Sequence, residues 1–144
     1  MKFLNVDLEV RSPTDLQPLI DDLGEDVVNL HAGRVHDHHL ATFEATVTGD
    51  ANHLIGYFCG LVDNLAPEAR RSWDEAFSKV FDIGYEAGVG PKSYESDLQP
   101  ETVAAVARVG AAIRVTIYPP SKAPRRAGLR TNGSVASLPL PVCR

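Results

Sequence analysis

The sequence contains few cysteines and no long apolar run. Only two of its 144 residues are cysteine, Cys59 and Cys143, so we expect free thiols in a reducing compartment and no disulfide framework. A membrane-spanning helix would need about 18 consecutive apolar residues, and no such run is present. Asp7 and Glu9 interrupt the first ten positions, where a secretory signal would need an uncharged apolar block. We therefore expect a cytoplasmic protein that does not enter the membrane.

The sequence also lacks the short motifs that mark common catalytic sites. It contains no Gly-x-Ser-x-Gly elbow, no His-Glu-x-x-His helix and no Gly-Lys-Ser/Thr phosphate loop. Cys59 is expected on a packed helix, where burial usually leaves a thiol inert. These absences favour a protein that is not an enzyme.

Charge is distributed unevenly along the chain. All 19 acidic residues lie in residues 1–118 with nine of the 14 Lys and Arg, which gives this part a net charge of −10. The other five basic residues lie in residues 119–144, which are rich in Pro, Gly and Ser. An acidic body repels phosphate, so we expect no nucleic-acid partner for the folded part. We predict a single domain over residues 1–118 and a disordered basic tail over residues 119–144.

Hydrophobic periodicity predicts an α+β fold. Alternation of apolar and polar residues predicts strands over residues 2–10, 27–35, 40–48, 79–87 and 111–118. Helical spacing predicts helices over residues 14–24, 50–65, 66–77 and 100–109. The order β-α-β-β-α-α-β-α-β is typical of a two-layer sandwich, in which helices pack on one face of a mostly antiparallel five-stranded sheet.

The strongest helical pattern lies in residues 50–65. Asp50 is the predicted N-cap, since its carboxylate can accept from free N–H groups of the first turn. The apolar stripe is wide, so we expect this helix to cover the sheet. Its members are Leu54, Ile55, Phe58, Leu61, Val62 and Leu65.

Two further packing predictions follow from spacing. In the last strand, Ile113, Val115 and Ile117 alternate with polar residues and should face the core. Trp73 and Phe77 are four residues apart in a predicted helix, so their rings should pack together.

Three stretches carry a resemblance to a known family. They are PLIDDLGEDVVNLHAGR, with a helix ending at Leu23-Gly24, the helix over residues 50–65, and LQPETVAAVARVGAAIRVTIY, with a short helix and a last strand ending in tyrosine. Over residues 1–118 the chain resembles a bacterial α+β domain family of unknown function. Families of this type are similar to small immunity-like and interaction domains. The resemblance therefore implies binding to a protein, without a catalytic motif.

Five carboxylates are expected on the outward faces of the strands: Asp7, Glu9, Glu44, Asp82 and Glu86. Four of them, Asp7, Glu9, Asp82 and Glu86, are the candidate partner-binding residues. A general acid and base pair would need one carboxylate in an apolar setting, which nothing in the sequence indicates. A plain solvated sheet face is one reading of these residues. A docking face for a basic protein is the other.

Histidines form the second candidate group. His36 and His38 are two apart and would face the same way in an extended hairpin, with His31 near them. Together with a neighbouring carboxylate such as Asp37 or Glu44 they could bind zinc or nickel. The alternative is a solvated hairpin turn in which His and Asp are ordinary turn formers.

The leading hypothesis is a small cytoplasmic bacterial protein-interaction domain, immunity-like in role, whose acidic face binds a basic partner. The first alternative is a metal-binding protein or small metal-dependent hydrolase built on His36 and His38, which would need a stoichiometric metal. A second alternative is a homodimer that forms through edge strands left unpaired in the sheet.

Overall fold

The computed structural model describes residues 1–90 and 92–121. Its strands are β1 (Lys2–Ser12), β2 (Val27–Val35), β3 (His38–Ala45), β4 (Ser78–Glu86) and β5 (Ala112–Tyr118). Its helices are α1 (Gln17–Leu23), α2 (Ala51–Asp63), α3 (Pro67–Glu75) and α4 (Pro100–Arg108), with a 3-10 turn, η1 (Gly24–Asp26), after α1. Residues 122–144 of the predicted tail lie outside the described residues.

The strands form one five-stranded sheet in the order β2-β3-β1-β4-β5. The central strand β1 runs antiparallel to β3 and β4, and β2 runs antiparallel to β3. β5 runs parallel to β4, because α4 carries the chain back before β5 begins. The predicted α+β fold with a mostly antiparallel five-stranded sheet is confirmed, and the sheet is mixed.

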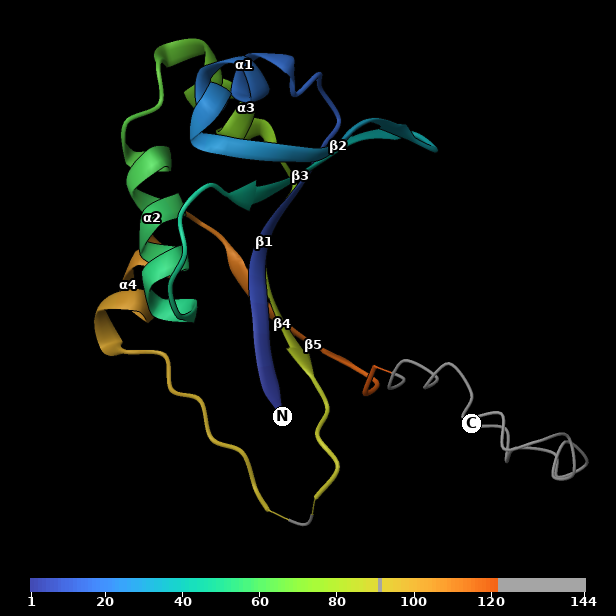
Figure 1. The fold of residues 1–144 in the computed structure, drawn as a ribbon. Helices are drawn as coiled ribbons and strands as arrows, with labels where there is room; N and C mark the ends of the chain where they lie inside the picture. Colours follow the sequence, from blue (N-terminus) through green and yellow to red (C-terminus); the bar gives the residue numbers. More distant parts are fainter. Residues whose placement is uncertain (91, 122–144) are drawn as a thin grey trace, which may run out of the picture.

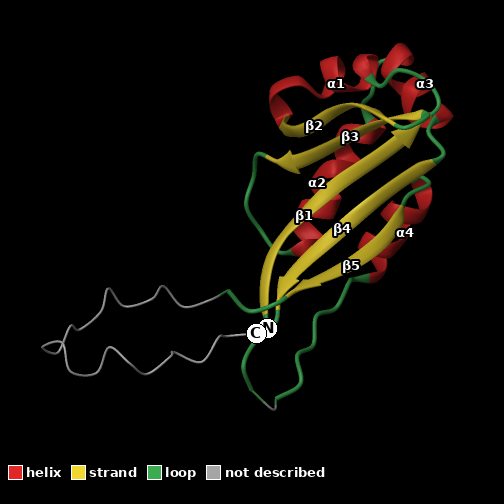
Figure 2. Ribbon diagram, turned by 90° about the vertical axis from the view of Figure 1, so that its right-hand side faces the viewer, coloured by secondary structure: helices red, strands yellow, loops and turns green. Residues whose placement is uncertain are grey.

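The helices lie on one side of the sheet. Figure 1 shows α2 and α4 along this side and α1 and α3 packed together at one end of the molecule. Figure 2 looks onto the other side, which we call the open face. In that view α2 and α4 lie behind the strands, and α1 and α3 lie at the end of the molecule next to β2. Alternate residues of β1 point to the two sides. Val6, Leu8 and Val10 are fully buried on the helix side, whereas Asp7 and Glu9 lie half-buried on the open face.

Helix α2 covers the middle of the sheet, as its periodicity predicted. Asp50 caps it by accepting a hydrogen bond from the backbone N–H of His53 at 2.8 Å. Phe58 is fully buried, and its ring lies 5.9 Å from that of Phe81 on β4. The apolar face of α2 thus packs against β1 and β3, and Phe58 reaches β4 through Phe81.

Trp73 and Phe77 do not pack together, so that prediction is wrong. Helix α3 ends at Glu75, and Ala76 has extended backbone with φ −64° and ψ 135°. The four-residue helical spacing therefore no longer holds for the two rings. Trp73 is buried and donates from Nε1 to the carbonyl of Val109 at 2.9 Å, whereas Phe77 is 60% exposed.

The apolar residues of the last strand point inward as predicted, but they are not buried there. Ile113, Val115 and Ile117 point to the helix side, the same side as their register partners Phe81 and Ile83. They are nevertheless 37%, 57% and 56% exposed. The reason is that β5 is the outermost strand, and α4 packs mainly against α2.

The N-cap of α2 provides a test of this architecture. We expect Asp50→Ala to lower the free energy of unfolding by about 1 kcal/mol, because the N–H of His53 loses its acceptor. Asp50→Ser keeps an oxygen at the cap and should lose much less. Urea unfolding followed by circular dichroism measures both changes. Equal losses in the two variants would contradict a capping role.

Candidate functional site

All four predicted partner-binding carboxylates lie on the strands that the sequence indicated. Asp7 and Glu9 lie two apart on β1, and Asp7 faces Asp82 directly across the β1–β4 pair. Glu86 lies at the end of β4, where it faces Lys2. The structure therefore brings Asp7, Glu9 and Asp82 together and leaves Glu86 apart from them.

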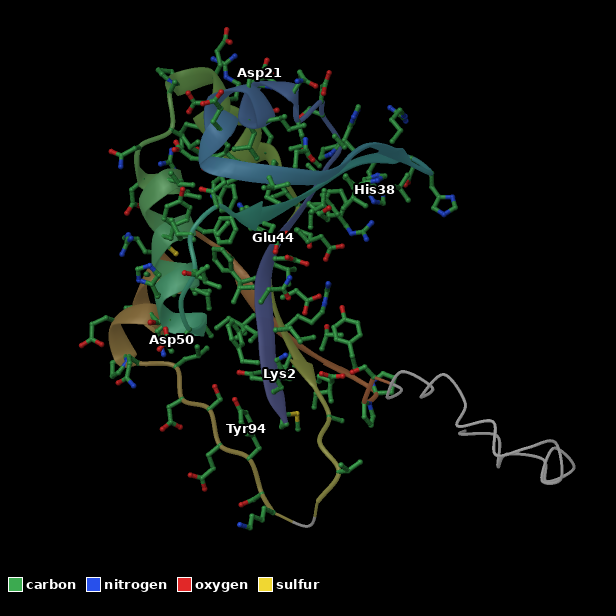
Figure 3. The ribbon with its side chains drawn as sticks, viewed as in Figure 1. Lys2, Asp21, His38, Glu44, Asp50 and Tyr94 are labelled. Atoms are coloured by element: carbon green, nitrogen blue, oxygen red, sulfur yellow. The ribbon has the colours of Figure 1, made fainter. Side chains whose placement is uncertain are left out.

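A row of three carboxylates crosses the centre of the open face. Glu44 on β3 faces Asp7, and Asp7 faces Asp82. Figure 3 shows Glu44 beside β1, on the side of the sheet turned away from α2. Side chains directly opposite in antiparallel strands lie about 4.5–5.5 Å apart at Cβ, and like charges there are destabilising. We call Glu44, Asp7 and Asp82 the carboxylate row.

The crowding shows in the ionisation of the middle residue. Burial raises the pKa of the Asp7 carboxyl from 3.8 to about 6, and the charges of Glu44 and Asp82 add to this rise. A shift in this direction means that the surroundings disfavour the charged form. At neutral pH an ionised Asp7 is therefore energetically unfavourable beside the charges of Glu44 and Asp82.

Glu9 lies next to the row, but arginines neutralise it. Arg11 donates to Glu9 Oε1 from Nε at 3.1 Å and from Nη2 at 2.8 Å. Arg114 on β5 donates from Nη1 to Glu9 Oε2 at 2.6 Å. Burial opposes ionisation here, yet the hydrogen bonds from Arg114 and Arg11 hold the pKa of Glu9 below its usual value. The charge of Glu9 is thus matched inside the chain.

In the part of the structure that is described, positive charge lies near only one end of the carboxylate row. Asp82 accepts from Thr116 Oγ1 at 2.6 Å, and Arg114 Nη1 lies 3.6 Å from its Oδ2. Asp7 accepts from the neutral Asn5 Nδ2 at 3.1 Å. Among residues 1–90 and 92–121, neither Asp7 nor Glu44 forms an ion pair with a cation. The uncompensated charge of the row therefore lies at its β3 end.

Glu86 has a different environment. Its carboxylate accepts hydrogen bonds from the backbone N–H and the Oγ of Ser121. These bonds hold the pKa of Glu86 below its usual value. Glu86 is partly exposed and is tied to the segment that follows β5, so it does not belong to the carboxylate row.

The predicted histidine ligands are spread along the β2–β3 hairpin. The connection is shorter than the predicted residues 36–39, because β3 already begins at His38. Only His36 and Asp37 form the turn, and His36 has a positive φ of 58°. His31 lies in the exposed middle of β2. The spacing argument assumed an extended chain through His36, and the turn removes that alignment.

His38 is already engaged by neighbouring side chains. Arg11 donates from Nη1 to His38 Nε2 at 2.8 Å, and the His38 Nδ1 lies 3.1 Å from Asp37 Oδ1. A metal can bind either ring nitrogen of a histidine, and both nitrogens of His38 already have partners. In the described part of the chain, no group of three or more His, Cys, Asp or Glu side chains is arranged to hold a metal ion.

A second acidic region lies between α1 and α3, away from the open face. A hollow of about 490 Å³ there is lined in part by Asp21, Asp22 and Glu68. Asp22 accepts from the backbone N–H of Ala66 at 2.9 Å, and Asp21 accepts from Gln17 Nε2 at 2.8 Å. Two of its carboxylates thus satisfy donors of the fold, which makes this region a useful control for the carboxylate row.

Sequence reasoning placed Glu44 among the outward carboxylates but left it out of the four partner-binding candidates, and it missed both arginines around Glu9. The alternation of each strand placed these side chains outward, but their grouping depends on the strand order. Arg114 and Glu9 are 105 residues apart in the chain. The outward position of Glu44 in a predicted strand placed it on the open face. Its position next to Asp7 follows only from the pairing of β3 with β1.

Comparisons of the chain with protein-family models, with curated proteins and with solved structures found no match. Among the described residues, no helix is both long enough and apolar enough to cross a bilayer. The function inferred for this chain therefore rests on the geometry and charge of the open face.

Asp7→Asn should stabilise the fold at neutral pH. The pKa of Asp7 is higher in the folded chain, about 6, than its ordinary value of 3.8. The folded state then binds the proton more tightly, so stability falls as pH rises between these two values. With allowance for solvent screening of a half-exposed carboxylate, we expect a gain of about 1 kcal/mol near pH 7.5 and none near pH 3.5. Urea unfolding at both pH values measures the gain.

A titration of the carboxyl groups by NMR checks the cause. Glu44→Gln should lower the pKa of Asp7, because it removes one of two neighbouring charges. Glu101→Gln, on the exposed first turn of α4, should leave that pKa unchanged. An Asp7 pKa near 4 in the unaltered protein would contradict the crowding described above.

Proposed function

We propose that this chain is a protein-interaction domain whose open face binds a basic segment of a partner protein. The observation that supports the proposal is the carboxylate row. Three like charges stand side by side on a face that no described helix covers, and Asp7 and Glu44 have no cation of the described chain beside them. A partner's Lys or Arg would supply the missing charge.

The energetics favour a binding role over a folding role for the row. Like charges directly opposite one another destabilise a sheet. A neutral polar residue would occupy the half-buried position of Asp7 at lower cost. Features that oppose stability are expected mainly at functional sites. A cation between Asp7 and Glu44 would turn repulsion into attraction and would lower the pKa of Asp7.

The surroundings of the row indicate where the cation would lie. Arg114 approaches Asp82 at the β5 end and repels a second cation there. At the other end, Glu44 faces Val28 on β2, which is 48% exposed. A Lys or Arg side chain has an apolar stem and a charged head. Its stem would lie against Val28 and its head between Glu44 and Asp7.

The wider charge distribution is consistent with such a partner. Residues 1–118 carry a net charge of −10, and complementary charge accelerates the encounter with a basic protein. The resemblance of the sequence to bacterial immunity-like and interaction domains leads us to propose the same kind of role here, in a bacterial cytoplasm. The partner we propose is a protein with a basic segment.

An NMR titration with a peptide of eight lysines tests the binding face. We expect amide shifts in β1 and β3 around Asp7 and Glu44. The double variant Asp7→Asn/Glu44→Gln should weaken binding about tenfold or more, equivalent to about 1.4 kcal/mol. The matched control, Asp21→Asn/Glu68→Gln, removes the same charge from the region between α1 and α3 and should bind almost as well as the unaltered chain.

The pH dependence separates the row from a general charge effect. Since Asp7 has a pKa of about 6, affinity should fall as the pH is lowered through this value. The Asp7→Asn/Glu44→Gln variant should show a much smaller fall in the same range. Equal weakening by the two double variants, or shifts confined to α1 and α3, would overturn the proposal.

A further inference from the structure

The strand β5 forms one edge of the sheet. It pairs with β4 along one side in a continuous parallel register from Ala112 to Tyr118. Along its other side, no strand of residues 1–90 and 92–121 pairs with it. Figure 2 shows β5 at the margin of the sheet, beyond β4. Edge strands of this kind present unpaired N–H and C=O groups to other chains.

The apolar side chains of β5 are exposed on the helix side of this edge. Ile113 is 37% exposed, Val115 57% and Ile117 56%. On the neighbouring helix α4, Val103 is also 48% exposed. Ile113, Val115 and Ile117 are β-branched, the type that pairs well across strands.

Within the described residues, the β2 edge of the sheet carries features that oppose pairing with another chain, and β5 does not. On β2 the register shifts between Asn29 and His31, and Gly33 and Arg34 follow toward the turn. Bulges and charges of this kind block pairing with another chain. β5 contains no proline, no glycine and no register shift. Its one charged side chain, Arg114, is turned to the open face and bound to Glu9.

We propose that two copies of this chain associate through β5, antiparallel and about a two-fold axis at Val115. The two sheets would then form one continuous sheet of ten strands, with the helices of both copies on the same side. A two-fold contact of this kind uses the same patch on both copies. It does not involve the carboxylate row, so it stands or falls independently of the proposed basic partner.

The pairing register follows from the sequence of β5. With Val115 opposite the partner copy's own Val115, all seven residues of the strand are paired. Ile113 then faces Ile117 of the second copy, so each exposed apolar side chain meets another one. On the open face, Arg114 faces Thr116, a neutral hydrogen-bonding residue.

Neighbouring registers are less favourable. Shifting the second copy by two residues toward the start of β5 places Arg114 opposite Arg114, and like charges directly opposite are destabilising. The opposite shift leaves Ala112 and Ile113 of each copy without a partner in the other strand. A shift by one residue would place the helices of the two copies on opposite sides and would bring Ile113 opposite Thr116. The register centred on Val115 avoids each of these penalties.

Sedimentation velocity on the full chain over a range of concentrations tests the association. We expect the unaltered chain to dimerise and Val115→Lys to be monomeric, with at least a hundredfold weaker association, because symmetry places two lysines opposite each other. The matched control is Val28→Lys on β2, at a similar exposed fraction of 48%. It should dimerise like the unaltered chain.

Disulfide cross-linking tests the register and does not depend on a destabilising variant. Paired antiparallel residues have Cα atoms about 4.5 or 5.5 Å apart, and both spacings permit a disulfide. In a Cys143→Ser background, Val115→Cys should therefore form a covalent dimer on mild oxidation. Thr116→Cys should not, since its counterpart lies two residues away along the second strand.

Either of two results would overturn the proposal. One is a chain that stays monomeric at all concentrations with no cross-link at Val115. The other is a dimer that persists in Val115→Lys or is abolished by Val28→Lys. Circular dichroism of each variant confirms the fold, and a Val115→Lys chain that is unfolded leaves the cross-linking result to decide.

Discussion

The alternation of the central strand β1 is the constraint on which the rest of the structure depends. Val6, Leu8 and Val10 must point to one side to be buried under α2, so Asp7 and Glu9 must point to the other. A slip of one residue would place carboxylates in the core. The packing that holds the two layers together therefore also fixes the charges on the open face. Crowding of carboxylates is a consequence of a register that the fold cannot change.

The parallel strand β5 makes this face asymmetric. Because α4 returns the chain parallel to β4, Arg114 arrives opposite Asp82 and within reach of Glu9. The charge at this end of the carboxylate row is compensated, whereas Glu44 at the β3 end is not. The same placement at the margin of the sheet leaves Val115 without cover. One topological feature thus accounts for the direction of the charge imbalance and for the exposed apolar edge.

Local sequence patterns predicted helix caps and apolar helix faces. They were insufficient for burial and side-chain grouping, which depend on the strands and helices that lie next to each other in space. The N-cap at Asp50 and the apolar face of α2 were predictable because both depend on residues within a few positions. The exposure of Val115 was not, because burial depends on which strand is outermost. The predicted packing of Phe77 against Trp73 was wrong for a related reason. One residue with extended backbone after α3 changes the direction of the Phe77 ring. The pairing of Glu44 with Asp7 required the strand order, which alternation does not contain.

The two inferred surfaces are compatible, and their geometry has a consequence for binding. Pairing through β5 keeps the helices of both copies on one side, so the two carboxylate rows lie on one continuous open face. Each Arg114 then lies near the two-fold axis, and each uncompensated Glu44 lies toward the outer strands. A partner with two basic segments could engage both rows, and the second contact would form at a high effective concentration. A single half-exposed charge pair contributes only weak attraction. Such weak pairs are sufficient for binding when a dimer formed through β5 presents two carboxylate rows to the same partner.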